Sequence, residues 1–217
     1  MTIDFSAVLP YLPLMLKALG VSLEVTVLSF FIGSVLGIFV YLGRRSTAAP
    51  LRWLSQAFIE VFRNTPLLVQ LYLIYFGLPQ VGINLDPFWA TLAGMTLNNA
   101  AYTAEIFRAG IESVPTGQVE AAGALGLRFS QTFRFVVLKP AIRNVLPALT
   151  NQFIVLFLFS SVGSVISLNE LTSALADLNQ RTLRTLEIFT VGGLLYYLAS
   201  AVIAGSSRLA ERYLFRW

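Results

Sequence analysis

The sequence contains no cysteine and no histidine. Without cysteine, disulfide bonds, thiolate nucleophiles and cysteine-bound metal sites are excluded. Without histidine, the commonest metal ligand and the commonest general base near neutral pH are missing as well. Charged residues are also scarce, at 12% of the chain, whereas soluble proteins carry about 25%. A membrane-embedded hydrolase or transferase would need a nucleophile with its base, or a metal cluster, so these absences argue against an enzyme.

Apolar residues, in contrast, make up 56% of the chain. A membrane-crossing helix needs about 20 mostly apolar residues. On that criterion the sequence predicts an all-α integral membrane protein with a single transmembrane domain over residues 1–217. The five predicted spans are about 17–42, 54–78, 88–109, 140–166 and 186–209.

Lysine and arginine are concentrated in alternate connections between the predicted spans. Three basic residues lie in 43–53 and three in 110–139, and more follow in the C-terminal tail up to Arg216, whereas 79–87 has none. Basic connections favour the cytoplasmic side, so we expect the N-terminus outside and the C-terminus inside. The first charged residue is the acidic Asp4, and the N-terminal segment lacks the features of a secretory signal, so we expect it to be mature protein at the outer surface.

Small residues recur at intervals of four in the first predicted span, at Ser29, Gly33 and Gly37. This spacing makes a smooth helix face that another helix can approach closely. The face suits either packing within the chain or a subunit interface, and packing within the chain is the favoured interpretation.

The 110–139 connection contains a short stretch rich in small residues, QVEAAGAL, at residues 118–125. We expect a helix that ends at Gly126, with Glu120 in its first turn, where a negative charge complements the helix dipole. Ser130 is the expected N-cap of a second short helix. A helix lying on the bilayer would need large apolar residues opposite basic ones.

This slender helix is therefore predicted to fit closely against a partner protein. The predicted contact residues are Glu120, Ala121, Ala122 and Gly126. Reversing the charge of Glu120, or placing a bulky residue at Ala122, is expected to disrupt that contact without unfolding the chain.

Polar side chains inside the predicted spans form two groups. Long charged side chains near a membrane boundary can reach polar surroundings, so Glu60 with Arg63 and Glu105 with Arg108 are expected to form structural ion pairs at a spacing of three residues. Uncharged groups nearer the midplane can hydrogen-bond an amino acid or tie helices together. These candidates for a substrate path are Gln70, Asn98, Asn99, Tyr102, Gln152 and Ser160.

The segment EAAGALG (120–126), followed by IRNVLP (142–147), resembles the EAA loop of bacterial ABC-importer permeases. More narrowly, the chain resembles the polar amino-acid permease subfamily, of the histidine/glutamate/glutamine/arginine importer type. The matching segments are VFRNTPLLVQLYLIYFGLP (61–79), the residues 100–127, LKPAIRNVLPALTNQFIVL (138–156) and VISLNEL (165–171).

This resemblance implies a type I ABC importer permease fold in a bacterial inner membrane, with the EAA loop as the cytoplasmic coupling helix. The implied partners are a cytosolic ATPase dimer, a second permease subunit, an external or periplasmic amino-acid-binding protein and membrane lipids, but no nucleic acid. The implied function is import of polar L-amino acids. ATP and magnesium would be bound by the ATPase, and no cofactor by this non-catalytic chain, which has no phosphate-binding loop.

The chain departs from the family where many members have the polar run K-D-T-S, because residues 157–161 here read FLFSS. This loss of a charged pair favours a heterodimer, in which the other permease supplies the missing groups, over a homodimer. The alternative is a secondary transporter or channel for small polar solutes. It would require a titratable residue deep in the membrane or inverted halves with broken helices.

Overall fold

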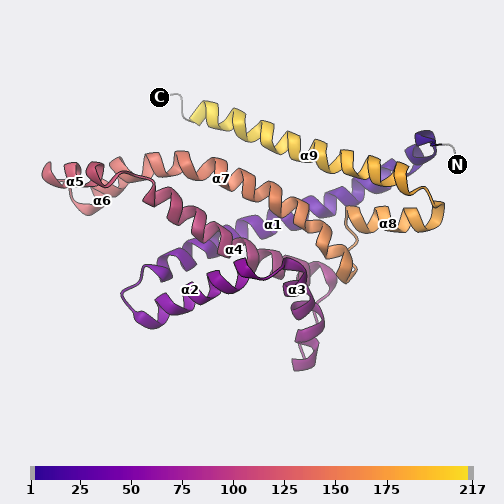
Figure 1. The fold of residues 1–217 in the computed structure, drawn as a ribbon, viewed down its shortest axis with the longest axis horizontal. Helices are drawn as coiled ribbons and strands as arrows, with labels where there is room; N and C mark the ends of the chain where they lie inside the picture. The colour runs from indigo at the N-terminus through magenta and orange to yellow at the C-terminus, as the bar shows by residue number, and fades with distance from the viewer. Residues whose placement is uncertain (1–2, 215–217) are drawn as a thin grey trace.

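The computed structural model describes residues 3–214, and all regular structure in this range is helical (Figure 1). The prediction of an all-α protein is therefore confirmed, and Arg216 of the predicted basic tail lies outside the described residues. The elements are η1 (Phe5–Tyr11), α1 (Leu12–Arg44), α2 (Ala49–Asn64), α3 (Leu67–Tyr72), η2 (Leu73–Gly77), η3 (Leu78–Val81), α4 (Pro87–Glu112), α5 (Thr116–Ala124), α6 (Phe129–Thr132), η4 (Phe133–Val137), α7 (Leu138–Phe159), η5 (Ser160–Ile166), α8 (Leu171–Thr182) and α9 (Thr185–Leu214).

Three helical stretches in the described part of the chain are long and apolar enough to cross a membrane, at 5–44, 129–166 and 185–213. They contain the first, fourth and fifth predicted spans. A shorter apolar helical segment covers 67–81, and α4 contains the third predicted span, 88–109. The number of five crossings stays a prediction.

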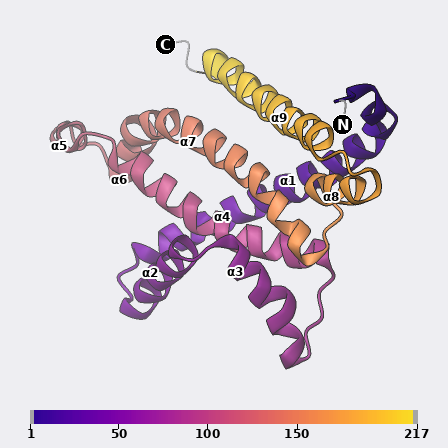
Figure 2. The same cartoon turned by 45° about the vertical axis from the view of Figure 1, so that its right-hand side comes forward.

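The second predicted span, 54–78, is wrong as a single helix. The structure divides it into α2 and α3, with Thr65 in an extended conformation at φ −117° and ψ 142°. Pro66 explains the break, because its ring disfavours helical geometry in the preceding residue and it has no backbone N–H to donate. Figures 1 and 2 show α3 projecting from the body of the molecule at an angle to α2.

The small-residue face of α1 packs against α4 within the chain. A Cβ atom at Gly33 would lie 2.8 Å from the backbone oxygen of Thr96, and one at Gly37 would lie 2.9 Å from that of Ala100. The hydroxyl of Ser29 donates to the Leu92 carbonyl at 3.4 Å. The prediction that this face packs within the chain is therefore confirmed. A side chain larger than hydrogen at either glycine would push the two helices apart.

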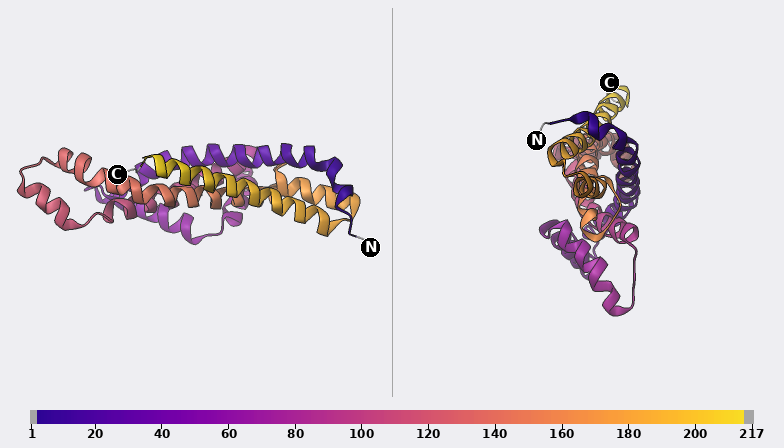
Figure 3. Two further views of the ribbon diagram at one scale, coloured as in Figure 1. Left: turned by 90° about the horizontal axis from the view of Figure 1, so that it is seen from above. Right: turned by 90° about the vertical axis from the view of Figure 1, so that its right-hand side faces the viewer.

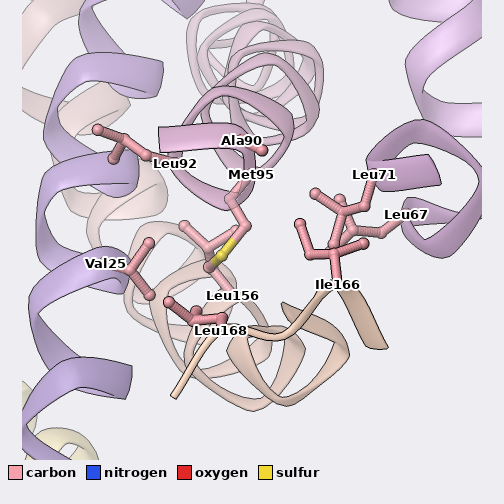
Figure 4. Packing of buried hydrophobic residues seen from close by; sticks show 9 residues of the cluster. All are labelled: Val25, Leu67, Leu71, Ala90, Leu92, Met95, Leu156, Ile166 and Leu168. Carbon is pink, nitrogen blue, oxygen red and sulfur yellow. The ribbon is translucent and has the colours of Figure 1, made fainter. Parts of the chain in front are cut away.

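The largest apolar core joins α1, α3, α4, α7, η5 and the turn after η5 (Figure 4). Its buried members are Val25, Leu67, Leu71, Ala90, Leu92, Met95, Leu156, Ile166 and Leu168. The molecule is elongated, with α5 at one end and α8 at the other (Figures 1 and 3). The sequence did not predict α8, which lies within the connection between the fourth and fifth predicted spans.

Candidate functional site

Helix α5 begins after Pro115 and its last residue is Ala124, followed by the C-cap Leu125 and then by Gly126, which has a left-handed φ of +77°. The Gly126 N–H donates to the Gly123 carbonyl at 2.9 Å, and the Leu127 N–H donates to the Ala122 carbonyl at 3.1 Å. This pair of bonds is the Schellman ending, so the prediction that glycine ends this helix is confirmed. The next helix, α6, begins at Phe129, so Ser130 lies inside it and the predicted N-cap is wrong.

The predicted docking residues of α5 do not all face outward. Glu120 and Ala121 are exposed, but Ala122 is only 3% exposed. A bulky residue at Ala122 would therefore disturb the packing of the loop itself, which corrects the experiment expected from the sequence. Ala124 is the better probe, because residues four apart on a helix share a face and it lies beside Glu120, away from Ala122.

Two large apolar side chains next to α5 are almost fully exposed, although the ring of Phe129 stacks on that of Phe133. Leu125 is 82% exposed and Phe129 is 86% exposed. The residues predicted from the sequence here were Glu120 and small residues, and included no large apolar side chain. Apolar side chains grouped at an exposed tip are typical of a protein interaction site, so Leu125 and Phe129 are added to the candidate docking surface, with Glu120, Ala121 and Ala124.

The side chains of Gln70 and Asn98 donate hydrogen bonds to the backbone at the break between α2 and α3. Because Pro66 cannot donate to the carbonyl of Phe62 four residues earlier, that oxygen needs other donors. Nε2 of Gln70 donates to it at 3.0 Å and Nδ2 of Asn98 donates at 3.2 Å. The same Nδ2 also donates to Oε1 of Gln70 at 3.1 Å. The contacts of these two amides are thus those of helix ties, while Oδ1 of Asn98 is buried without a partner among the described residues.

Asn99 and Gln152 connect three helices. Nδ2 of Asn99 donates to the Phe30 carbonyl of α1 at 3.1 Å, and Oδ1 of Asn99 accepts from Nε2 of Gln152 of α7 at 3.2 Å. Asn99 is fully buried and Gln152 nearly so. These contacts likewise match the tying role, and a part in the substrate path stays a prediction.

The remaining path candidates are Tyr102 and Ser160. Tyr102 is half-buried, and the guanidinium carbon of Arg63 lies 5.4 Å from its ring centroid. Ser160 is fully buried and donates to the Phe157 carbonyl at 2.7 Å. In residues 157–161, where the sequence departs from the family pattern, Phe157 is fully buried, whereas the side chains of Leu158 and Phe159 are partly exposed.

Glu105 is the centre of a cluster of charged side chains from three helices. It forms ion pairs with Arg44 of α1, with Arg63 of α2 at 3.7 Å and with Arg108 at 2.8 Å. Arg63 thus pairs with Glu105 of α4, not with Glu60 as expected, because α2 packs against α4. Glu60 instead accepts a hydrogen bond from Nδ2 of Asn64 at 2.8 Å. The cluster ties α1, α2 and α4 together, whereas the sequence predicted only separate pairs within a helix.

Glu170 is a buried carboxylate that sequence reasoning did not select. It is fully buried and forms no ion pair among residues 3–214. Its oxygens accept hydrogen bonds from the Ser22 hydroxyl at 3.2 Å, the Tyr196 hydroxyl at 2.8 Å and the Ser173 N–H at 2.9 Å. Burial raises the pKa of this carboxyl. The only signal in the sequence was its place in VISLNEL, directly before the first residue of α8.

Comparison with known proteins places this geometry in context. Residues 30–216 match the family model described as binding-protein-dependent transport system inner membrane component. The chain is 38% identical over 213 residues to the arginine transport system permease protein ArtQ of Bacillus subtilis (strain 168), covering 98% of this chain and 97% of that protein. It is 35% identical over 214 residues to the glutamine transport system permease protein GlnP of Escherichia coli (strain K12), with 98% of each covered.

A solved structure is also similar along nearly the whole chain. The crystal structure of an amino acid ABC transporter with histidines contains a chain that is 39% identical, with a TM-score of 0.93. The match covers 98% of this chain and all of that one. A chain of the MetNI methionine ABC transporter in an inward-facing conformation shares the fold, with a TM-score of 0.75 at 23% identity.

Proposed function

Since this chain belongs to the family of binding-protein-dependent transport system inner membrane components, we propose that it is the permease subunit of an ATP-driven importer of polar L-amino acids. The observation that carries the proposal is α5, a short helix at the tip of the molecule whose neighbours Leu125 and Phe129 are left uncovered. The relatives named for arginine and glutamine transport support the substrate class.

The proposed topology has five crossings with the N-terminus outside. The first crossing is formed by α1. The second is formed by α3 and the helical turns that follow it, with α2 lying at the inner membrane boundary. The other three are formed by α4, by α7 with η5, and by α9. The basic residues of 43–53 and 110–139 support the orientation. In this arrangement α5 lies on the cytoplasmic side of a bacterial inner membrane and α8 on the outer side.

The proposed partners follow from this arrangement. A dimer of cytosolic ATPases binds α5 of this chain and the matching helix of a second permease subunit. ATP and magnesium are bound there, so this chain is the non-catalytic part of the complex. An external binding protein delivers the amino acid from the outer side. The uncharged stretch 157–161 supports a heterodimer, in which the second permease carries the charged groups absent here.

One observation favours the alternative, a secondary transporter or channel. Such a transporter requires a buried titratable group, and Glu170 is a buried carboxyl that forms no ion pair within the described range 3–214. Its position beyond the predicted span 140–166, and its set of donors from three helices, fit a structural role better.

The proposal is tested by reconstituting the chain with its ATPase, second permease and binding protein in proteoliposomes and measuring uptake of labelled amino acids. Glu120→Lys and Ala124→Trp should each lower ATP-dependent uptake at least tenfold, because they change the exposed face of α5, and the ATPase should no longer co-purify. Thr47→Trp, an exposed position off α5, is the matched control. Uptake that continues without ATP and follows a proton gradient would establish the secondary transporter instead.

A further inference from the structure

A cavity of about 340 Å³ lies between α1, α4 and the start of α7. Its walls are apolar side chains, including Ile38 and Leu42 of α1, Phe107 and Ile111 of α4, and Ile142 and Val145 of α7. No polar atom is exposed on its surface. A ligand that fills this groove must therefore be a hydrocarbon along most of its length.

The groove opens to the outside of the chain. Leu42 is 55% exposed, Ile38 is 44% exposed and Ile142 is 42% exposed. Two of the three helices that form it, α1 and α7, belong to stretches that are long and apolar enough to cross a membrane. The hydrocarbon that surrounds such helices is lipid, so an acyl chain can enter the groove from the side.

A positive charge lies at one end of the groove. Tyr41 lines the cavity, and its hydroxyl accepts a hydrogen bond from Nη1 of Arg45 at 3.0 Å. Arg45 is exposed, and it forms none of the ion pairs within residues 3–214. The carboxylate that interacts with it electrostatically, Glu112, is already paired with Arg108 at 2.5 Å. A guanidinium in this position can bind a phosphate with two parallel hydrogen bonds.

We propose that this groove binds an anionic phospholipid, with one acyl chain between α1, α4 and α7 and the phosphate at Arg45. The occupant is chosen by two features together: the apolar groove requires an acyl chain, and the exposed Arg45, which forms no ion pair within residues 3–214, favours an anionic headgroup over a zwitterionic one. The proposal depends neither on the transported substrate nor on which face of the membrane this end occupies.

The test uses the complex of this chain with its ATPase and second permease, reconstituted in nanodiscs of phosphatidylglycerol and phosphatidylethanolamine in equal amounts. Native mass spectrometry after gentle extraction should show phosphatidylglycerol retained in preference to phosphatidylethanolamine. Arg45→Ala should reduce that retention about fivefold, since one basic residue near a membrane surface contributes about a fivefold factor in binding anionic lipid. Arg212→Ala, which removes an exposed arginine of α9 away from the groove, should leave it unchanged.

A second pair of variants tests the apolar wall. Ile142→Trp should fill the groove and reduce retention of both lipids, whereas Leu198→Trp, at an exposed position of α9, should have no effect. Leu42→Trp tests the same wall if Ile142→Trp does not fold. Equal retention of the two lipids by the unmodified chain, or unchanged retention in all groove variants, would overturn the proposal.

A second copy of the chain could cover the same groove, and the cysteine-free sequence allows a direct test. In Ile142→Cys, any disulfide-linked dimer formed under mild oxidation must join position 142 of two copies. No such dimer is expected if lipid occupies the groove. An efficient cross-link would show that the groove is a protein interface and would refute lipid binding there.

Discussion

The two ends of the molecule differ in the burial of their most distinctive side chains. At the α8 end, Glu170 is fully buried and is held by donors from α1, α8 and α9. At the α5 end, Leu125 and Phe129 are almost fully exposed. The buried network around Glu170 is therefore completed within one chain, whereas Leu125 and Phe129 at the α5 end are left uncovered. Changes at α8 should act on stability, and changes at α5 should act on assembly.

The largest effect on stability is expected from Glu170→Ala. It removes the acceptor for the Ser22 and Tyr196 hydroxyls and the N-cap of α8, so stability should fall by about 3 kcal/mol. The thermal unfolding midpoint in detergent measures this loss. Asp177→Ala removes an exposed carboxylate from the same helix and should change stability by less than about 0.5 kcal/mol. Similar effects of the two variants would mean that the buried network does not hold this end together.

The converse result is expected for Leu125→Asp and Phe129→Asp at the α5 end. Each should weaken ATPase binding about thirtyfold, because truncation of a buried apolar anchor costs an interface about 2 kcal/mol. The unfolding midpoint should not change, since neither side chain is buried in the chain itself. Titration of the purified ATPase onto the immobilised permease measures the affinity. A lower unfolding midpoint with unchanged affinity would refute the assignment of this surface.

A smaller effect, on the local stability of the α5 end, is expected from Gly126→Ala. The left-handed φ of Gly126 disfavours any side chain with a Cβ atom, although no neighbour occupies that space. We expect a cost of about 1 kcal/mol, confined to the end of α5. Hydrogen exchange of the α5 amides should accelerate about fivefold, while exchange in α8 serves as the internal control and stays constant.

The smallest effect is a pH dependence at the α8 end. Because burial raises the pKa of Glu170 in the folded chain, the folded state binds this proton more tightly than the unfolded state. The stability from this group is complete below the ordinary carboxyl pKa and declines as the pH rises through the raised value. Unfolding midpoints of the unmodified chain and Glu170→Gln between about pH 4 and pH 8 should differ in this decline. An identical pH profile in the two proteins would show that Glu170 does not titrate in this way.

Much of the fold could be predicted from local patterns. Apolar length alone indicated the helices that became α1, α7 and α9, and the glycine after EAAGAL indicated where α5 ends. Both signals are local, because helix length depends on hydropathy over about 20 residues and a left-handed C-terminal residue depends on one backbone angle. Pro66 was an equally local signal, because it breaks the second predicted span into α2 and α3, but the prediction did not use it.

The sequence by itself determined that this is a helical membrane protein with a small-residue face on its first long helix and an exposed short helix after the third predicted span. Only the tertiary structure decided that Arg63 pairs with Glu105 and that Gln70 and Asn98 supply the donors Pro66 cannot. It also decided that Glu170 is buried with no ion-pair partner in the described part of the chain. The physical reason is that charge pairing, hydrogen-bond satisfaction and burial depend on the distances between helices, and residues far apart in the chain set those distances.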